Sequence, residues 1–378
     1  MLFSSAIISI AAAYFKFYAS YKFLFIYLLF VIFIFGAKIE KNISWKIFSL
    51  YFILLCYIII NSALGNTHQF ILLLIVLLTL FISRIIIKNN SCEKIDHQLS
   101  NFFIIILLFL LMELIIVIID PALLHDLFYF NNSNEGYRAL DNKLTSYLGY
   151  DLYGLNSIYF GAQSASQLSL MSLVYFIFKY KRYASLSNLL FMVTSFIILL
   201  FSLTITIGFI IIILLTLALL KMKRVASLGL IFAVLLTIII YNIKQFHYPD
   251  FRKLIGIYVI DPYLLRFSKL DMVSLIFGTG FKGEIIFSEL PAELAILNLT
   301  IRLGLFGFLL LAFTLFIYPF LRTSDWMLRS LLIIGFFSLM HYPVSVEFPF
   351  ITLTILIAAL SLSCRDSHDL TNPRSKHT

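Results

Sequence analysis

Long apolar blocks alternate with short polar segments along almost the whole chain. A bilayer core of about 30 Å is crossed by about 20 helical residues, and shorter spans are tolerated. The blocks therefore predict an all-α, polytopic integral membrane protein of twelve transmembrane helices. Ten or eleven spans are the alternative, because the first block is short and the junction at 203–205 is tight. The predicted spans are 2–15, 22–37, 47–64, 69–87, 101–120, 158–178, 184–203, 205–220, 226–243, 294–318, 327–340 and 346–363.

Two of the predicted outer loops are long, 121–157 and 244–293. In the second loop, Asp261-Pro262 is typical of a helix start, and apolar residues recur at helical spacing from Leu264 to Phe277. This pattern predicts an amphipathic helix that lies on the outer membrane surface or over the bundle and ends at Gly278-Thr279-Gly280.

The remaining organisation is simple. We expect a single membrane domain over 1–363 and a disordered cytoplasmic tail over 364–378, because the tail is polar and follows the last apolar block.

The distribution of Lys and Arg predicts the orientation, because short cytoplasmic loops of membrane proteins are rich in both residues. With both termini in the cytoplasm, more than half of the 28 basic residues fall in inside segments, among them Lys179, Lys181 and Arg182. The short outside loop 65–68 has none.

Composition agrees with this class and excludes others. Of the 378 residues, 61% are hydrophobic and 12% are charged, whereas soluble domains have about 45–50% and about 25%. A soluble or a disordered protein is thereby excluded. The net charge of +9 is spread in twos and threes between apolar blocks, which does not favour a nucleic-acid partner. The three cysteines form no metal-ligand spacing, so no metal site is expected.

The long outer loops hold cations that suit an anionic, lipid-linked substrate. Arginine is the best residue for this work, because its planar guanidinium binds two phosphate oxygens and stays protonated. The candidates in the loops are Arg138, Arg252 and Arg266, and Arg302 is a further candidate two to three turns inside the tenth span. The alternative interpretation of each is a solvated charge, an interfacial anchor or an internally paired arginine.

A proton acceptor is also available in the second loop. Carboxylates and histidine act as general bases when they are near the reacting hydroxyl. The candidates are Glu293, His247 and Asp271. The chain has no nucleotide-binding motif of the Walker A or GxGxxG type, which disfavours ATP-driven transport.

The stretch 266–320 resembles the O-antigen polymerase and ligase superfamily. That family has an Arg-bearing outer helix, a GxG turn, and a span whose middle is similar to LGLFG, which here are Arg266, Gly278-Thr279-Gly280 and residues 303–307. Polymerases of this kind also have an Arg, ten residues and then a Gly in the outer loops, and Arg138 and Gly149 have that spacing. Eleven residues separate Arg266 from Gly278 in the second loop, which departs from the pattern.

The resemblance implies a glycosyltransferase of the bacterial inner membrane that needs no cofactor or metal. It would move a growing glycan from an undecaprenyl-diphosphate carrier onto a lipid-linked repeat unit. Its implied partners are the undecaprenyl-diphosphate-linked oligosaccharide, the lipid bilayer and a chain-length regulator protein. We predict that Arg138, Arg266 and Arg302, and then Arg252, bind the diphosphate. Ligases of the superfamily have a His before the LGLFG-like span, where this chain has Pro291-Ala292-Glu293, which favours a polymerase.

Two transporter classes compete with this interpretation. A flippase for the same lipid-linked units has about twelve spans, but its loops are usually short and its charges line a central cavity. A secondary transporter would have paired, Gly/Pro-interrupted spans in its two halves, and the sequence has no such pairing.

Overall fold

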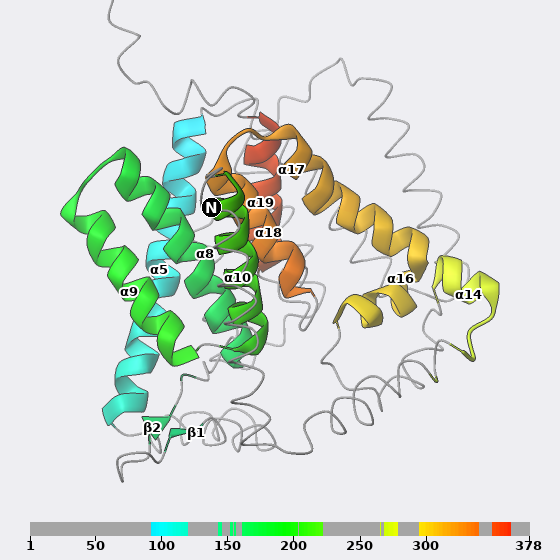
Figure 1. Cartoon of the computed structure of the whole chain (residues 1–378), viewed down its shortest axis with the longest axis horizontal. Helices are drawn as coiled ribbons and strands as arrows, with labels where there is room; N and C mark the ends of the chain where they lie inside the picture. Colours follow the sequence, from blue (N-terminus) through cyan, green and yellow to red (C-terminus); the bar gives the residue numbers. More distant parts are fainter. Residues whose placement is uncertain are drawn as a thin grey trace, which may run out of the picture.

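The computed structural model describes 92–119, 143–145, 152–153, 155, 161–202, 204–221, 265, 268–278, 295–339 and 350–363. These residues are helical apart from a small hairpin and the connections between elements. Figure 1 shows the arrangement of the elements. The helices are α5 (Cys92–Ile119), α8 (Gly161–Arg182), α9 (Leu186–Ser202), α10 (Ile205–Lys221), α14 (Met272–Phe277), α16 (Ala295–Ala312), the π-helix η2 (Phe313–Ile317), α17 (Tyr318–Arg322), α18 (Trp326–Ser338) and α19 (Phe350–Ser363).

The hairpin lies within the first long loop. Strands β1 (Lys143–Thr145) and β2 (Leu152–Tyr153) pair antiparallel, with Lys143 opposite Tyr153. The amide of the buried Leu155 donates to the carbonyl of Phe201 at 2.8 Å. This part of the loop is thereby tied to the last turn of α9.

Seven predicted spans coincide with described helices. Their bounds agree to within a few residues, except that α5 begins at Cys92, nine residues before the predicted start at 101. Among the described residues, two helices are long and apolar enough by composition to cross a membrane, Asp96–Ile119 and Leu303–Arg322. The predicted spans 2–15, 22–37, 47–64, 69–87 and 226–243 and the tail 364–378 lie outside the described residues, so the count of twelve stays a prediction.

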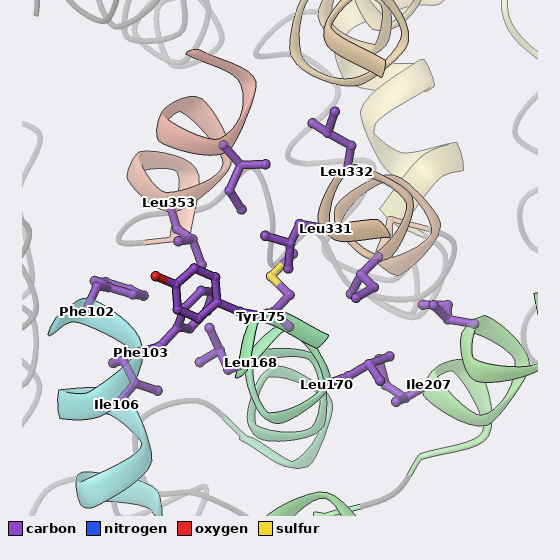
Figure 2. Close-up of a cluster of buried hydrophobic side chains, with 14 of the residues drawn as sticks. Phe102, Phe103, Ile106, Leu168, Leu170, Tyr175, Ile207, Leu331, Leu332 and Leu353 are labelled. Atoms are coloured by element: carbon purple, nitrogen blue, oxygen red, sulfur yellow. The ribbon is translucent and has the colours of Figure 1, made fainter. Parts of the chain in front are cut away.

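Helix α8 is at the centre of the helical bundle, in contact with α5, α9, α10 and α18. Small residues make close packing possible here, because they let helix backbones approach each other. The buried small residues of α8 are Ser164, Ala165, Ser166, Ser169 and Ser172. The aromatic part of the core lies nearer the other end of the helix, where Tyr175 packs against Phe103 with ring centroids 5.2 Å apart, and Figure 2 shows Leu331 and Leu353 beside them.

Polar contacts define which helix ends lie together. The Tyr175 hydroxyl donates to Asp96 Oδ1 at 2.9 Å, and Lys179 Nζ lies 3.4 Å from Asp96 Oδ2. Arg182 pairs with Asp325 at 2.5 Å. The start of α5, the end of α8 and the α17–α18 connection therefore share one end of the bundle. We call it the basic end, defined by Lys179, Lys181, Arg182, Arg322 and Arg329.

The opposite end has contacts of its own. The hydroxyls of Ser166 and Thr204 lie 3.3 Å apart, which joins the first turns of α8 to the α9–α10 connection. Leu155 reaches Phe201 at the same end. The consecutive helices α8, α9 and α10 therefore alternate in direction.

The surface of α9 has an inverted polarity. Its exposed large side chains are apolar, whereas Asn188, Ser195 and Ser202 are buried. Soluble helices have the opposite arrangement, because burying polar groups is unfavourable and water solvates them. The exposed apolar residues of α9 are Leu186, Leu190, Val193, Phe196, Ile197 and Leu200.

Asp325 provides a test of the basic end. The side chain of Asp325 is 5% exposed, pairs with Arg182, and accepts the amide of Met327 at 2.8 Å as the N-cap of α18. We expect Asp325→Ala to lower the free energy of unfolding by roughly 3 kcal/mol, because a buried pair loses one partner and a helix loses its cap. Asp325→Asn keeps the cap and should lose less. Thermal unfolding in detergent measures the loss in both variants, and Ser324→Ala, at an exposed position, is the control. Equal melting temperatures of Asp325→Ala and Ser324→Ala would refute the stabilising role of Asp325.

Candidate functional site

Helix α14 is the described part of the amphipathic helix predicted in the second long loop. It begins at Met272 rather than near Pro262, because Ser268 and Lys269 form a turn and Asp271 is the N-cap. The predicted helix up to Phe277 is therefore not continuous: it is interrupted at 268–271, whereas Leu265 before the interruption is helical and the predicted start at Asp261-Pro262 lies outside the described residues. Its end is confirmed, since Gly278 is the C-cap and its amide donates to the carbonyl of Ser274 at 2.8 Å.

The chain turns sharply at Gly304 inside α16. Gly304 has φ 71° and ψ 164°, a conformation that is essentially restricted to glycine. A Cβ atom at this position would lie less than 3.0 Å from backbone atoms of Ile276, Phe277 and Gly278. The end of α14 therefore rests directly on the backbone of α16 at the kink, and Figure 1 shows the two helices side by side there.

This contact joins two segments that lie far apart in the sequence. Gly278 also has a positive φ of 94°, and it begins the glycine turn of the second loop. Gly304 belongs to the LGLFG segment. The two glycines meet because neither has a side chain to separate the backbones. We call this contact between Gly278 and Gly304 the glycine junction.

Arg302 lies next to the glycine junction, two residues before Gly304. The apolar span runs from Leu303 to Arg322, since the kink separates the first part of α16 from the rest. The depth expected for Arg302, two to three turns inside a span, stays a prediction. Its backbone directly precedes the apolar helix Leu303–Arg322.

Asp271 is the other candidate residue that the structure describes. Hydrogen bonds from the Ser274 side chain and from the Ser274 backbone amide, 3.1 Å from Oδ1, lower the pKa of the carboxyl below its usual value. The cap therefore stabilises α14 above the ordinary aspartate pKa and is lost as the pH falls through the lowered value. The same hydrogen bonds make the carboxylate a weaker proton acceptor.

Two substitutions separate capping from proton transfer at Asp271. Asparagine caps helices as well as aspartate does, whereas alanine does not. We expect Asp271→Asn to keep the activity proposed below and Asp271→Ala to reduce it by loosening α14. The measurement is the length distribution of the surface polymer on a gel. Complete loss in both variants, with normal expression, would instead identify Asp271 as the base.

The remaining candidates lie outside the described residues. They are Arg138, Arg252, Arg266, Glu293 and His247. Glu293 precedes the first residue of α16, Ala295, by two positions, and Arg266 follows the exposed Leu265. Their assignments stay predictions. Among the residues that the structure describes, no three His, Cys, Asp or Glu side chains gather as metal ligands do.

A polar cluster at the basic end was missed by the sequence analysis. Asp96, Tyr175 and Lys179 bind one another, with Lys179 Nζ donating to the Tyr175 hydroxyl at 3.0 Å. Asp96 had been assigned to a loop, although Tyr175 and Lys179 have the i, i+4 spacing of neighbours on one helix face. The cluster ties α5 to α8.

Comparison of the chain with known proteins leaves its family open. No protein-family model, no curated protein and no solved structure matches it.

Proposed function

We propose that the protein is a surface-polysaccharide polymerase of the bacterial inner membrane. In this proposal it transfers a glycan from an undecaprenyl-diphosphate donor onto a lipid-linked repeat unit at the outer face. The observation that carries the proposal is the glycine junction. It joins the two segments that resemble the O-antigen polymerase and ligase superfamily, and Arg302 beside it directly precedes the apolar helix Leu303–Arg322. An enzyme acting on a membrane-anchored diphosphate requires a cation at the end of an apolar span.

The membrane location is supported by the polarity of the bundle. Helix α9 has apolar side chains outside and small polar side chains inside, which suits a lipid environment. In the proposed topology of twelve spans, the basic end faces the cytoplasm, in keeping with the excess of Lys and Arg in cytoplasmic loops. The glycine junction and the two long loops then lie at the outer face.

The proposed reaction forms one glycosidic bond and breaks one sugar–phosphate bond. An acceptor hydroxyl attacks the anomeric carbon of the donor glycan, and undecaprenyl diphosphate leaves with the bonding electrons. Arg138, Arg266, Arg302 and Arg252 bind the diphosphate and stabilise the negative charge that develops on it. Glu293 or His247 accepts the hydroxyl proton, and Asp271, which its capping hydrogen bonds make a weaker proton acceptor, is the third candidate. The sugar–diphosphate bond supplies the free energy.

A flippase for the same lipid-linked units is the second candidate. It is favoured by polar side chains buried within the bundle, since a polar cargo needs polar partners on its way across the bilayer. Glu113 of α5 is fully buried, and the exposed fractions of Gln167 and Ser172 of α8 are 2% and 0%. A ligase remains the alternative within the superfamily.

A deletion strain of the source organism distinguishes these functions. Loss of the gene is expected to replace the ladder of surface polysaccharide on a gel by a single band of core plus one repeat unit. That band requires working transport and ligation, so only polymerisation would be missing. Complete loss of surface units would instead indicate a flippase or a ligase and would refute the polymerase.

A further inference from the structure

Helix α14 has an apolar face that no described helix covers. Met272, Val273 and Ile276 are 73%, 56% and 40% exposed. These positions follow the i, i+1, i+4 pattern of one helix face. Leu265, before the turn, is also exposed. Four large apolar side chains on so short a segment require an apolar environment.

The glycine junction sets the position of this face relative to the apolar helix Leu303–Arg322. The backbone of Ile276, Phe277 and Gly278 rests on Gly304, the second residue of the span Leu303–Arg322. Helix α14 therefore lies where the apolar span ends, which is the boundary between acyl chains and headgroups when that span crosses a bilayer.

The surroundings of α14 point to lipid rather than to the bundle. Figure 1 shows α14 on the side of α16 away from α5, α8 and α9. Beyond the kink, Leu305, Phe306 and Leu309 of α16 are exposed as well, so apolar surface is present on both helices. The exposed Lys269 lies in the turn just before α14 and carries the charge that anionic headgroups attract.

We propose that α14 inserts its Met272, Val273 and Ile276 face into the outer leaflet of the bilayer, with Lys269 among anionic headgroups. The inserted helix holds the glycine junction, and Arg302 beside it, at the level of the lipid phosphates. This inference rests on the membrane topology of the proposed function. It does not depend on the reaction that the protein catalyses.

Single cysteines labelled with an environment-sensitive fluorophore test the insertion. The full chain, with Cys56, Cys92 and Cys364 replaced by serine, is reconstituted into vesicles of phosphatidylethanolamine and phosphatidylglycerol. Met272→Cys and Val273→Cys replace exposed side chains, so they leave the packing intact. Both labels are expected to emit at short wavelength and to lose most of their fluorescence to lipids with a nitroxide near the headgroup.

Matched controls make the outcome decisive. A label at Ser268→Cys, in the exposed turn, should emit at longer wavelength and be quenched less. Quenching by a nitroxide at the end of the acyl chain should be weaker than by the shallow one, because α14 lies at the boundary. Water-like emission at both Met272→Cys and Val273→Cys would overturn the inference. So would short-wavelength emission without lipid quenching, which means that protein covers the face. Neither result depends on the polysaccharide gel, so failure of the reaction is detected separately.

Discussion

Gly304→Ala is expected to disrupt the glycine junction and to abolish the polymer ladder. An alanine at φ 71° and ψ 164° costs about 1–3 kcal/mol in backbone strain. Its Cβ would also collide with the backbone of α14, which has no flexible side chain there to move aside. Overpacking of this kind adds about 1–3 kcal/mol. We expect α14 to separate from α16 and the melting temperature in detergent to fall.

Two other glycines supply controls for this substitution. A Cβ at Gly208 in α10 meets nothing within 4 Å, so Gly208→Ala should leave the protein unchanged or stabilise it by up to about 1 kcal/mol. A Cβ at Gly335 would lie 2.9 Å from a ring atom of Phe316, a side chain that is able to shift, so Gly335→Ala should be intermediate. If Gly304→Ala had the melting temperature of Gly208→Ala and still produced the polymer ladder, the glycine junction would have no role in stability or in polymerisation.

Arg302→Ala is expected to lower the rate of polymerisation by roughly 100- to 1000-fold, the usual loss when one group that stabilises transition-state charge is removed. Arg302→Lys keeps the positive charge but loses the bidentate hydrogen bonds to phosphate, so its activity should be intermediate. The measurement uses purified protein in vesicles with lipid-linked repeat units, and it follows polymer length with time.

The control for Arg302 is an arginine at the other end of the same span. Arg322 is exposed at the basic end and lies over the ring of Tyr318, 5.3 Å from its centroid. Arg322→Ala should leave the polymerisation rate unchanged, because in the proposed topology it faces the cytoplasm. Equal losses in both variants would indicate a general effect of charge on membrane insertion. Full activity of Arg302→Ala would exclude it from the diphosphate site.

The helices were the most predictable part of the molecule. Apolar blocks of span length identify α8, α9, α10, α16, α18 and α19 to within a few residues, because a helix is the way a continuous chain satisfies its backbone hydrogen bonds in lipid. The start of α5 was missed, since Asp96 and Lys94 suggested a loop. The contact of Asp96 with Tyr175 on another helix explains why the helix continues through this polar turn.

The start of α14 shows the limit of periodicity. Apolar residues recur at helical spacing from Leu264 onward, yet the chain turns at Ser268 and Lys269. Asp271 is able to cap a helix, so its side chain favours a new start over continuation. Periodicity describes which residues share a face, and it does not detect an interruption that a single cap produces.

The sequence by itself determined the helices, the clustering of basic residues at one end and the glycines that permit unusual backbone angles. These are local properties of composition and spacing. Only the tertiary structure decided that Gly278 and Gly304 touch and that α14 lies beside α16. The reason is physical. The spacing of apolar residues determines which face of a helix is apolar, because that depends on neighbours in the sequence. Which helix packs against that face depends on contacts between residues that are distant in the sequence.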